Sequence, residues 1–106
     1  MTLELWELVE ISDGQLVDVR GILTKTHTIT TKRGETMMFA RLEDRFGAVV
    51  VVLMPRIYDR VSHIVADGAY LRIRGRVDQE DRDSTKLVAL DVAPYNDEPP
   101  VDWVTS

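Results

Sequence analysis

The chain has 106 residues, 44% of them hydrophobic and 29% charged, which is enough for one domain with a single core and too few for two. With 13 Lys and Arg against 18 Asp and Glu, its formal net charge is −5, and this overall balance argues against a nucleic-acid or membrane surface. The absence of cysteine excludes disulfide bonds and thiolate metal sites, so we expect a cytoplasmic protein.

The acidity is concentrated at the two ends of the chain. Residues 1–14 and 95–106 together hold seven acids and no Lys or Arg. Residues 15–94 hold the other 11 acids and all 13 bases, a net charge of +2. The central segment therefore remains compatible with a nucleic-acid partner.

No segment of the sequence predicts a membrane location or export. The longest apolar run, residues 48–54, is far shorter than the roughly 20 residues needed to cross a bilayer. The N-terminus also lacks a basic segment followed by an apolar stretch.

The N-terminal residues predict a short helix. Leu5, Leu8 and Val9 follow helical spacing, Thr2 is a candidate cap, and residues 12–14 are a stop signal. We interpret residues 1–15 as an N-terminal helix and linker.

Three strands follow in the sequence pattern. Alternation of apolar and polar residues begins at Leu16, and Gly21 within this strand indicates a bulge or sharp bend. Residues 24–36, rich in threonine, predict a long hairpin arm or loop. A second strand is expected over residues 37–43 and a third, apolar at every position, over residues 48–53.

A helix is expected after the third strand. Pro55 suits the first turn of a helix, and Asp67 and Gly68 are its expected stop. The apolar residues at helical spacing are Ile57, Tyr58, Val61, Ile64 and Val65.

After the expected helix, apolar and polar residues alternate again with a period of two. Residues 71–77 predict a fourth strand with Gly75 in its interior, residues 79–85 a polar turn, and residues 86–92 a fifth strand. The remainder, residues 94–106, is expected to be an acidic, proline-containing tail, with Trp103 as a candidate anchor.

Three strands, one helix and two further strands follow the order of the OB fold. This is an all-β (mainly β) fold, a five-stranded barrel with one helix between strands three and four. Gly21 and Gly75 supply the bends that closing so small a barrel requires. We expect residues 16–93 to form the OB-fold domain, preceded by the short N-terminal helix.

OB barrels usually bind ligands across strands two and three, so the second strand holds the first candidate site residues. If Leu42 faces the core, alternation places Met37, Phe39, Arg41 and Glu43 outward. An outward aromatic ring beside a guanidinium suits base stacking and phosphate contact. The alternative is that a long loop covers Phe39 and the ring is part of the core.

The hairpin between the first two strands is basic and rich in hydroxyl groups. Four bases face one acid, Glu35, and such residues bind a phosphate backbone. The alternative is a solvated hairpin tip kept soluble by its charge. The candidate nucleic-acid-binding residues are Lys25, His27, Thr28, Thr30, Thr31, Lys32, Arg33, Met37, Phe39 and Arg41.

Other features argue for weak binding or for a protein partner. Arg72, Arg74 and Arg76 alternate along the fourth strand, where solubilising charges or pairs with Asp78 and Asp91 are the commoner use. Residues 79–83 carry three acids and one base, which lowers the expected affinity for phosphates. The third strand is apolar on both faces, so an exposed strip there also fits a protein contact.

The sequence does not predict catalysis by this chain. Glu43 and Asp44 have no partnered histidine, and His27 and His63 lie in different elements without metal-ligand spacing. We expect no catalytic residue, no metal and no cofactor.

Residues 31–44 carry a specific motif. They read Thr-Lys-Arg-Gly-Glu-Thr-Met-Met-Phe-Ala-Arg-Leu-Glu-Asp, and this resembles the OB domain near the C-terminus of bacterial DNA polymerase III alpha subunits. The resemblance covers about residues 16–93. It implies a non-catalytic module that binds single-stranded DNA weakly and salt-dependently, beside other domains or subunits of a replicase. The parent protein would be a DNA-directed DNA polymerase.

A second resemblance concerns the same strand. Phe39, Leu42 and Asp44 are similar to the pattern in the anticodon-binding OB domain of aspartyl- and lysyl-type tRNA synthetases, which are class II enzymes. There the phenylalanine stacks on an anticodon base, which supports an outward Phe39. Val50 departs from both families, which usually have a polar residue at this position. Anticodon binding and a protein-interaction module therefore remain alternative functions.

Overall fold

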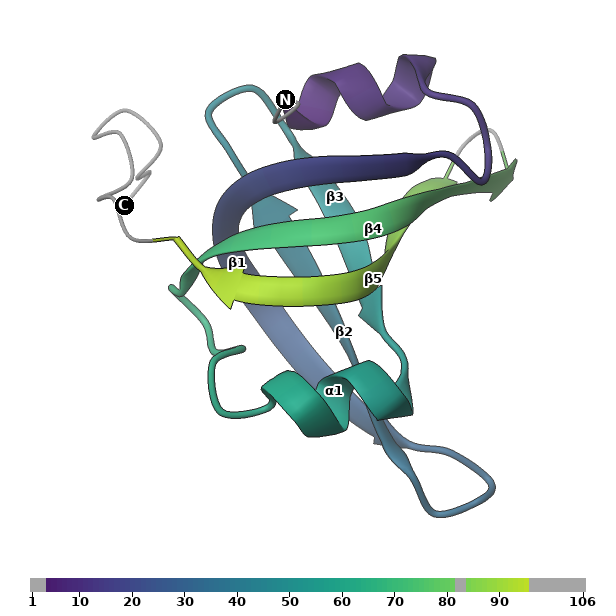
Figure 1. Cartoon of the computed structure of the whole chain (residues 1–106), viewed down its shortest axis with the longest axis vertical. Coiled ribbons are helices and arrows are strands. Elements are labelled where there is room, and N and C mark those ends of the chain that lie inside the picture. The colour runs from purple at the N-terminus through teal and green to yellow at the C-terminus, as the bar shows by residue number, and fades with distance from the viewer. Residues whose placement is uncertain (1–3, 82–83, 96–106) are drawn as a thin grey trace.

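The computed structural model describes residues 4–81 and 84–95, and they form a closed five-stranded barrel (Figure 1). Its strands are β1 (Leu16–Thr30), β2 (Thr36–Glu43), β3 (Ala48–Leu53), β4 (Tyr70–Asp81) and β5 (Ser84–Pro94). They pair in the order β1-β2-β3-β5-β4, and only the β3–β5 pair is parallel. With one helix, α1 (Pro55–Val61), between β3 and β4, this is the OB fold that the sequence predicts.

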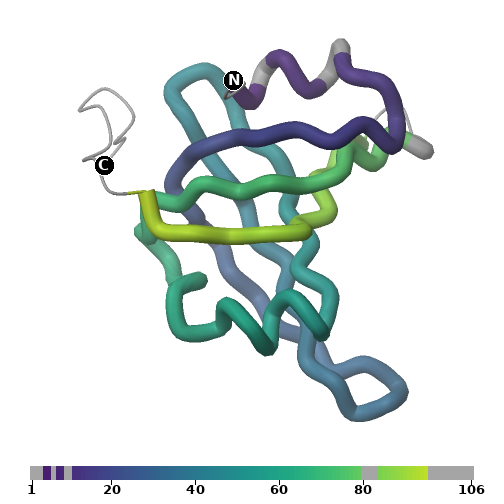
Figure 2. The backbone as a smooth tube through the Cα atoms, viewed as in Figure 1, coloured from purple at the N-terminus to yellow at the C-terminus, as the bar shows by residue number. Residues whose placement is uncertain are grey.

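The two ends of the barrel are covered by short helical segments, as the tube in Figure 2 shows. The 3-10 helix η1 (Leu5–Glu10) buries Leu5 and Leu8 in the core at one end. At the other end, Val61 of α1 and Val65 join the same core. Both ends are closed by apolar side chains, so the outer walls of the strands are the surfaces left for binding.

The N-terminal helix is confirmed, but as a 3-10 helix whose N-cap is Glu4. Glu4 donates its backbone N–H to the Glu7 carboxylate at 3.3 Å. Thr2, which the sequence suggested as the cap, lies outside the described residues. The expected tail residues 96–106, with Trp103, also lie outside them.

Gly21 and Gly75 stand where the strands cross most closely. A Cβ atom on Gly21 would lie 2.7 Å from the Glu43 carbonyl oxygen, and one on Gly75 would lie 2.7 Å from that of Val88. At Gly21 and Ile22, β1 changes from pairing with β4 to pairing with β2. At Gly75, the register of β4 against β5 shifts. The predicted bends are therefore confirmed.

The predicted helix is shorter than its apolar spacing indicated. It ends at Val61, although Ile64 and Val65 continue the spacing and Val65 is buried. The following loop bonds to β1 instead of extending the helix. Gly68 donates to the Leu23 carbonyl at 2.7 Å, and Leu23 donates to the Ala69 carbonyl at 2.9 Å.

The strands are longer than predicted. β1 continues to Thr30, so residues 24–30 form a hairpin arm, and only residues 31–35 form its turn. The expected polar turn at residues 79–85 is also mostly strand, because Asp78 pairs with Lys86 and Asp81 with Ser84. Ladder hydrogen bonds to a neighbouring strand stabilise these polar segments, which alternation alone does not reveal.

Asp67 fastens the loop after α1 to a bulge in β1. The register of β1 shifts between Thr24 and His27, and Lys25 has a φ of 50°. The Asp67 carboxylate accepts the backbone N–H of Thr26 at 2.9 Å. Bonds from the Thr26 backbone and hydroxyl lower the pKa of Asp67 from its usual 3.8, because they favour the charged carboxylate.

We expect Gly75→Ala to destabilise the barrel by about 1–3 kcal/mol, because its methyl group would overlap the β5 backbone and the Leu87 side chain. Chemical denaturation measures this loss. Gly34→Asn is the control, since Gly34 has no atoms within 4 Å of the Cβ position and asparagine tolerates its left-handed backbone. Equal stability of Gly75→Ala and wild type would contradict the close crossing.

We also expect the Asp67 contact to contribute to stability at neutral pH and to be lost in acid. Because the folded pKa lies below the unfolded one, this contribution is present above the usual Asp pKa and disappears as pH falls through the folded value. An NMR titration should give an Asp67 midpoint below 3.8. The Asp67→Asn variant should lose less stability than wild type over this pH range; a steeper loss in the variant would contradict the assignment.

Candidate nucleic-acid interface

The outer wall formed by β2, β3 and the distal half of β1 holds four of the candidate residues, His27, Met37, Phe39 and Arg41. On β2, Met38, Ala40 and Leu42 are buried in the core, as alternation predicts. Phe39 is half-buried and Arg41 is exposed, and neither belongs to the core cluster. The barrel therefore presents an aromatic ring and a guanidinium two residues apart on its outer surface.

Phe39 lies between two cross-strand neighbours. His27 pairs with it from β1, with ring centroids 6.3 Å apart and ring planes inclined by 37°. Val52 pairs with it from β3 and is only 8% exposed. His27 and Val52 therefore flank the Phe39 side chain on both sides. Part of the Phe39 ring remains accessible to solvent.

A second row of residues runs beside Phe39. Arg41 pairs with Val50 on β3, and Val50 pairs with Lys86 on β5. Val50 is 40% exposed, so an apolar surface lies between two cations. A groove of about 320 Å³ starts here, lined by Arg41, Ala48, Val49, Val50, Ser84 and Thr85. None of these lining residues is acidic.

Sequence reasoning missed Lys86 as a site residue. Its position beside Val50 depends on the parallel β3–β5 pair, and the two strands are separated in sequence by α1 and β4. Alternation within one strand gives no signal for this neighbour. The sequence left open which side of the third strand faces outward. In the structure Ala48 and Val50 are exposed, whereas Val52 is only 8% exposed.

The hairpin between β1 and β2 extends beyond the body of the barrel (Figure 1). Its bases Lys25, Lys32 and Arg33 are all exposed. Thr28 and Thr30 are exposed too, but they pair with Met38 and Thr36 and therefore share a face with those residues, not with Phe39. The structure brings together His27, Phe39 and Arg41 and places these two threonines on the other side of the hairpin.

Two of the candidate binding residues, Thr31 and Met37, are poorly placed to contact a ligand. The Thr31 hydroxyl accepts the backbone N–H of Glu35 at 3.2 Å and so stabilises the hairpin turn. Met37 pairs with Ile29 on the outward side, as expected, but it is only 9% exposed. Met37 therefore offers little contact surface to a ligand.

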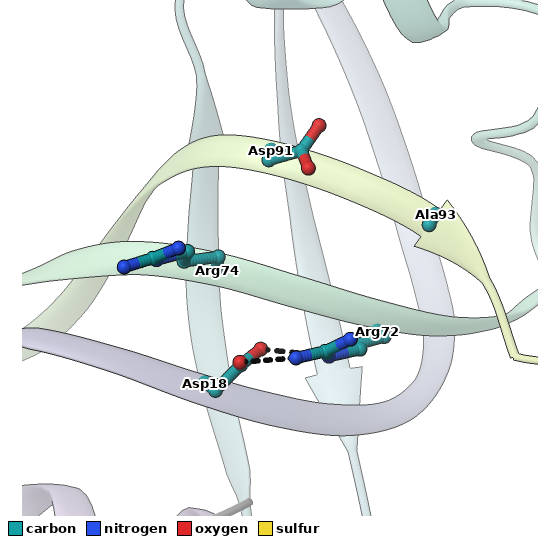
Figure 3. Close-up of a pocket in the computed structure, with 5 residues that line it drawn as sticks. All are labelled: Asp18, Arg72, Arg74, Asp91 and Ala93. Atoms are coloured by element: carbon teal, nitrogen blue, oxygen red, sulfur yellow. Dashed lines mark hydrogen bonds and ion pairs between the residues drawn. The ribbon is translucent and has the colours of Figure 1, made fainter.

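The opposite wall carries Arg72 and Arg74 of β4, shown in Figure 3. Arg72 donates two hydrogen bonds to the Asp18 carboxylate, at 3.0 and 2.6 Å, and this partner raises the pKa of Arg72. The sequence suggested pairs with Asp78 and Asp91. Asp91 is the cross-strand neighbour of Arg74 on β4, and it also lies 3.7 Å from Arg60. The residues Asp18, Arg72, Arg74, Asp91 and Ala93 line a small mixed-charge pocket of about 160 Å³.

Within residues 4–81 and 84–95, no group of three His, Asp or Glu side chains is placed to hold a metal ion. No helix in this part of the chain is long and apolar enough to cross a membrane.

Comparisons with known proteins find relatives of this chain in sequence and in fold. Over 73 residues, 69% of the chain, it is 34% identical to an error-prone DNA polymerase from Anaeromyxobacter dehalogenans, but it spans only 6% of that relative's length. The predicted resemblance to a bacterial polymerase is thus confirmed as sequence similarity.

Two solved structures share the fold at low identity. A domain of replication protein A from Methanococcus maripaludis matches with a TM-score of 0.71 and 13% identity, over 89% of this chain and 94% of that one. Asparaginyl-tRNA synthetase from Pyrococcus horikoshii matches with a TM-score of 0.70 and 13% identity, over 93% of this chain and 23% of that one.

The family model described as an OB-fold nucleic acid binding domain matches residues 17–95. This segment includes all five strands except the first residue of β1, and it contains all the candidate residues of the outer wall. The chain therefore belongs to the family of OB-fold nucleic acid binding domains.

Proposed function

We propose that this chain is a non-catalytic module that binds single-stranded DNA weakly and serves as one domain of a bacterial replicative DNA polymerase. The observation that carries the proposal is the β2–β3 wall. It presents the accessible Phe39 ring, the Val50 surface and the cations Arg41 and Lys86 side by side. The 34% identity to a segment of an error-prone polymerase supports the polymerase context.

Each part of this wall suits a different part of a single strand. An accessible aromatic ring stacks on any base, since every base has a π face, and such stacking contributes about 1–3 kcal/mol per base. Arg41 and Lys86 are placed to meet phosphates while Val50 packs against sugars or bases. Lys25, Lys32 and Arg33 extend the positive charge along the hairpin.

The charge of the wall also limits the affinity. The proposed interface has five cations: Arg41 on β2, Lys86 on β5 beside its cross-strand neighbour Asp78, and Lys25, Lys32 and Arg33 on the hairpin. If all five neutralised phosphates, the logarithm of the binding constant would fall with the logarithm of salt concentration at a slope of about −3.5. We therefore expect binding that is detectable at low salt and largely lost at physiological salt.

In titrations of a labelled dT oligonucleotide of about 16 nucleotides, we expect Phe39→Ala to weaken binding by about 1–2 kcal/mol, because the variant no longer stacks on one base. The loss is in the lower part of the usual range because only part of the Phe39 ring is exposed. Arg41→Ala should weaken binding and reduce the magnitude of the salt slope by about 0.7. Fluorescence anisotropy at about 50 and 200 mM salt measures both effects.

Arg74→Ala is the matched control, since Arg74 is an exposed arginine on the opposite wall. It should leave affinity and slope unchanged. Absence of wild-type binding at low salt, or equal loss in the Arg41 and Arg74 variants, would refute the proposed interface. Tighter binding to a tRNA anticodon stem-loop than to DNA of equal length would favour the anticodon-binding alternative.

A further inference from the structure

The turn between β2 and β3 displays a second aromatic ring. Phe46 is 50% exposed, which makes it more accessible than the half-buried Phe39. The Arg45 guanidinium carbon lies 4.6 Å from the centroid of the Phe46 ring. The ring and this cation stand together at the tip of the hairpin that carries Phe39 and Arg41.

This turn is held in one conformation by a single carboxylate. Asp44 accepts the backbone N–H groups of Phe46 at 2.9 Å and Gly47 at 3.0 Å through one oxygen. Its other oxygen accepts the backbone N–H of Leu5, in η1, at 2.8 Å. Asp44 also donates its own N–H to the Gly47 carbonyl at 3.0 Å. A ring presented by so restrained a turn loses little conformational entropy on binding.

The turn is continuous with the groove described above. Ala48 directly follows it, is exposed, and lines that groove with Arg41 and Val50. Phe39 and Glu43 are four residues apart on β2, roughly 13 Å along the strand, and the turn begins at the next residue. Phe39 and Phe46 therefore lie toward opposite ends of one hairpin, with the groove between them.

We propose that Phe46, with Arg45, is a second base-stacking platform, which lengthens the single-strand path from the β1–β2 hairpin to the β2–β3 turn. This inference rests on the proposed function. A base is favoured over a protein side chain as the occupant because a cation adjoins the ring and the connecting groove is lined by Arg41 and two hydroxyl residues, without an acid.

The test compares the whole chain and its variants on dT oligonucleotides of increasing length, from about 2 to about 16 nucleotides, since four stacked nucleotides already span roughly 14 Å. Phe46→Ala should bind the long oligonucleotides about 5- to 30-fold more weakly. It should bind the shortest ones as wild type does, because these reach only Phe39. Phe39→Ala should weaken binding at every length. Leu16→Ala, which removes a side chain that is 52% exposed on the paired β1–β4 segment, should match wild type.

A second readout does not depend on a loss of affinity. In F46W the stacking surface is retained, and addition of the long dT oligonucleotide should quench its fluorescence beyond the quenching of wild type, which has two tryptophans. If Phe46→Ala binds all lengths like wild type while Phe39→Ala is weakened, and F46W shows no excess quenching, the second platform is refuted and the proposed function stands. If wild type binds no oligonucleotide at low salt, both are refuted.

Discussion

The structure depends on the bends that let five strands close into a barrel. β1 must pair with β4 along its first half and with β2 along its second, and the change occurs at Gly21, where a Cβ atom would meet the Glu43 carbonyl. β4 meets the same constraint against β5 at Gly75. Closure buries one face of every strand. It also leaves two outer walls of different character, because η1 and α1 occupy the ends of the barrel.

The two walls differ in how their arginines are used. On the β1–β4 wall, Arg72 is engaged by two hydrogen bonds to Asp18. On the β2–β3 wall, Arg41 adjoins Val50 and a groove without acidic residues. An ion-paired guanidinium has its charge compensated, whereas one beside valine can neutralise a phosphate. The local arrangement of charge, and not the net charge of −5, therefore favours one wall for a polyanion.

Most of the barrel could be predicted from the sequence because its determinants are local. Period-two alternation places Met38, Ala40 and Leu42 inward, and this fixes Phe39 and Arg41 outward. The sequence-based predictions failed where contacts between segments distant in the sequence determine the structure. The loop after α1 bonds to Leu23 in place of a longer helix, and Lys86 reaches Val50 only through the parallel β3–β5 pair. The hairpin threonines were assigned to one site, although cross-strand pairing divides them from Phe39.

A weak site is physically consistent with the proposed role. Five cations and one or two stacked bases contribute little free energy at physiological salt. In a larger protein whose other parts also hold DNA, however, the module would meet the strand at a high effective concentration, so little intrinsic affinity is needed. Weak, base-tolerant stacking also lets a strand move past the module, because each released base is replaced by an equivalent one. A polar residue in place of Val50 could add hydrogen bonds that distinguish bases; valine, with methyl groups alone, adds none at this position.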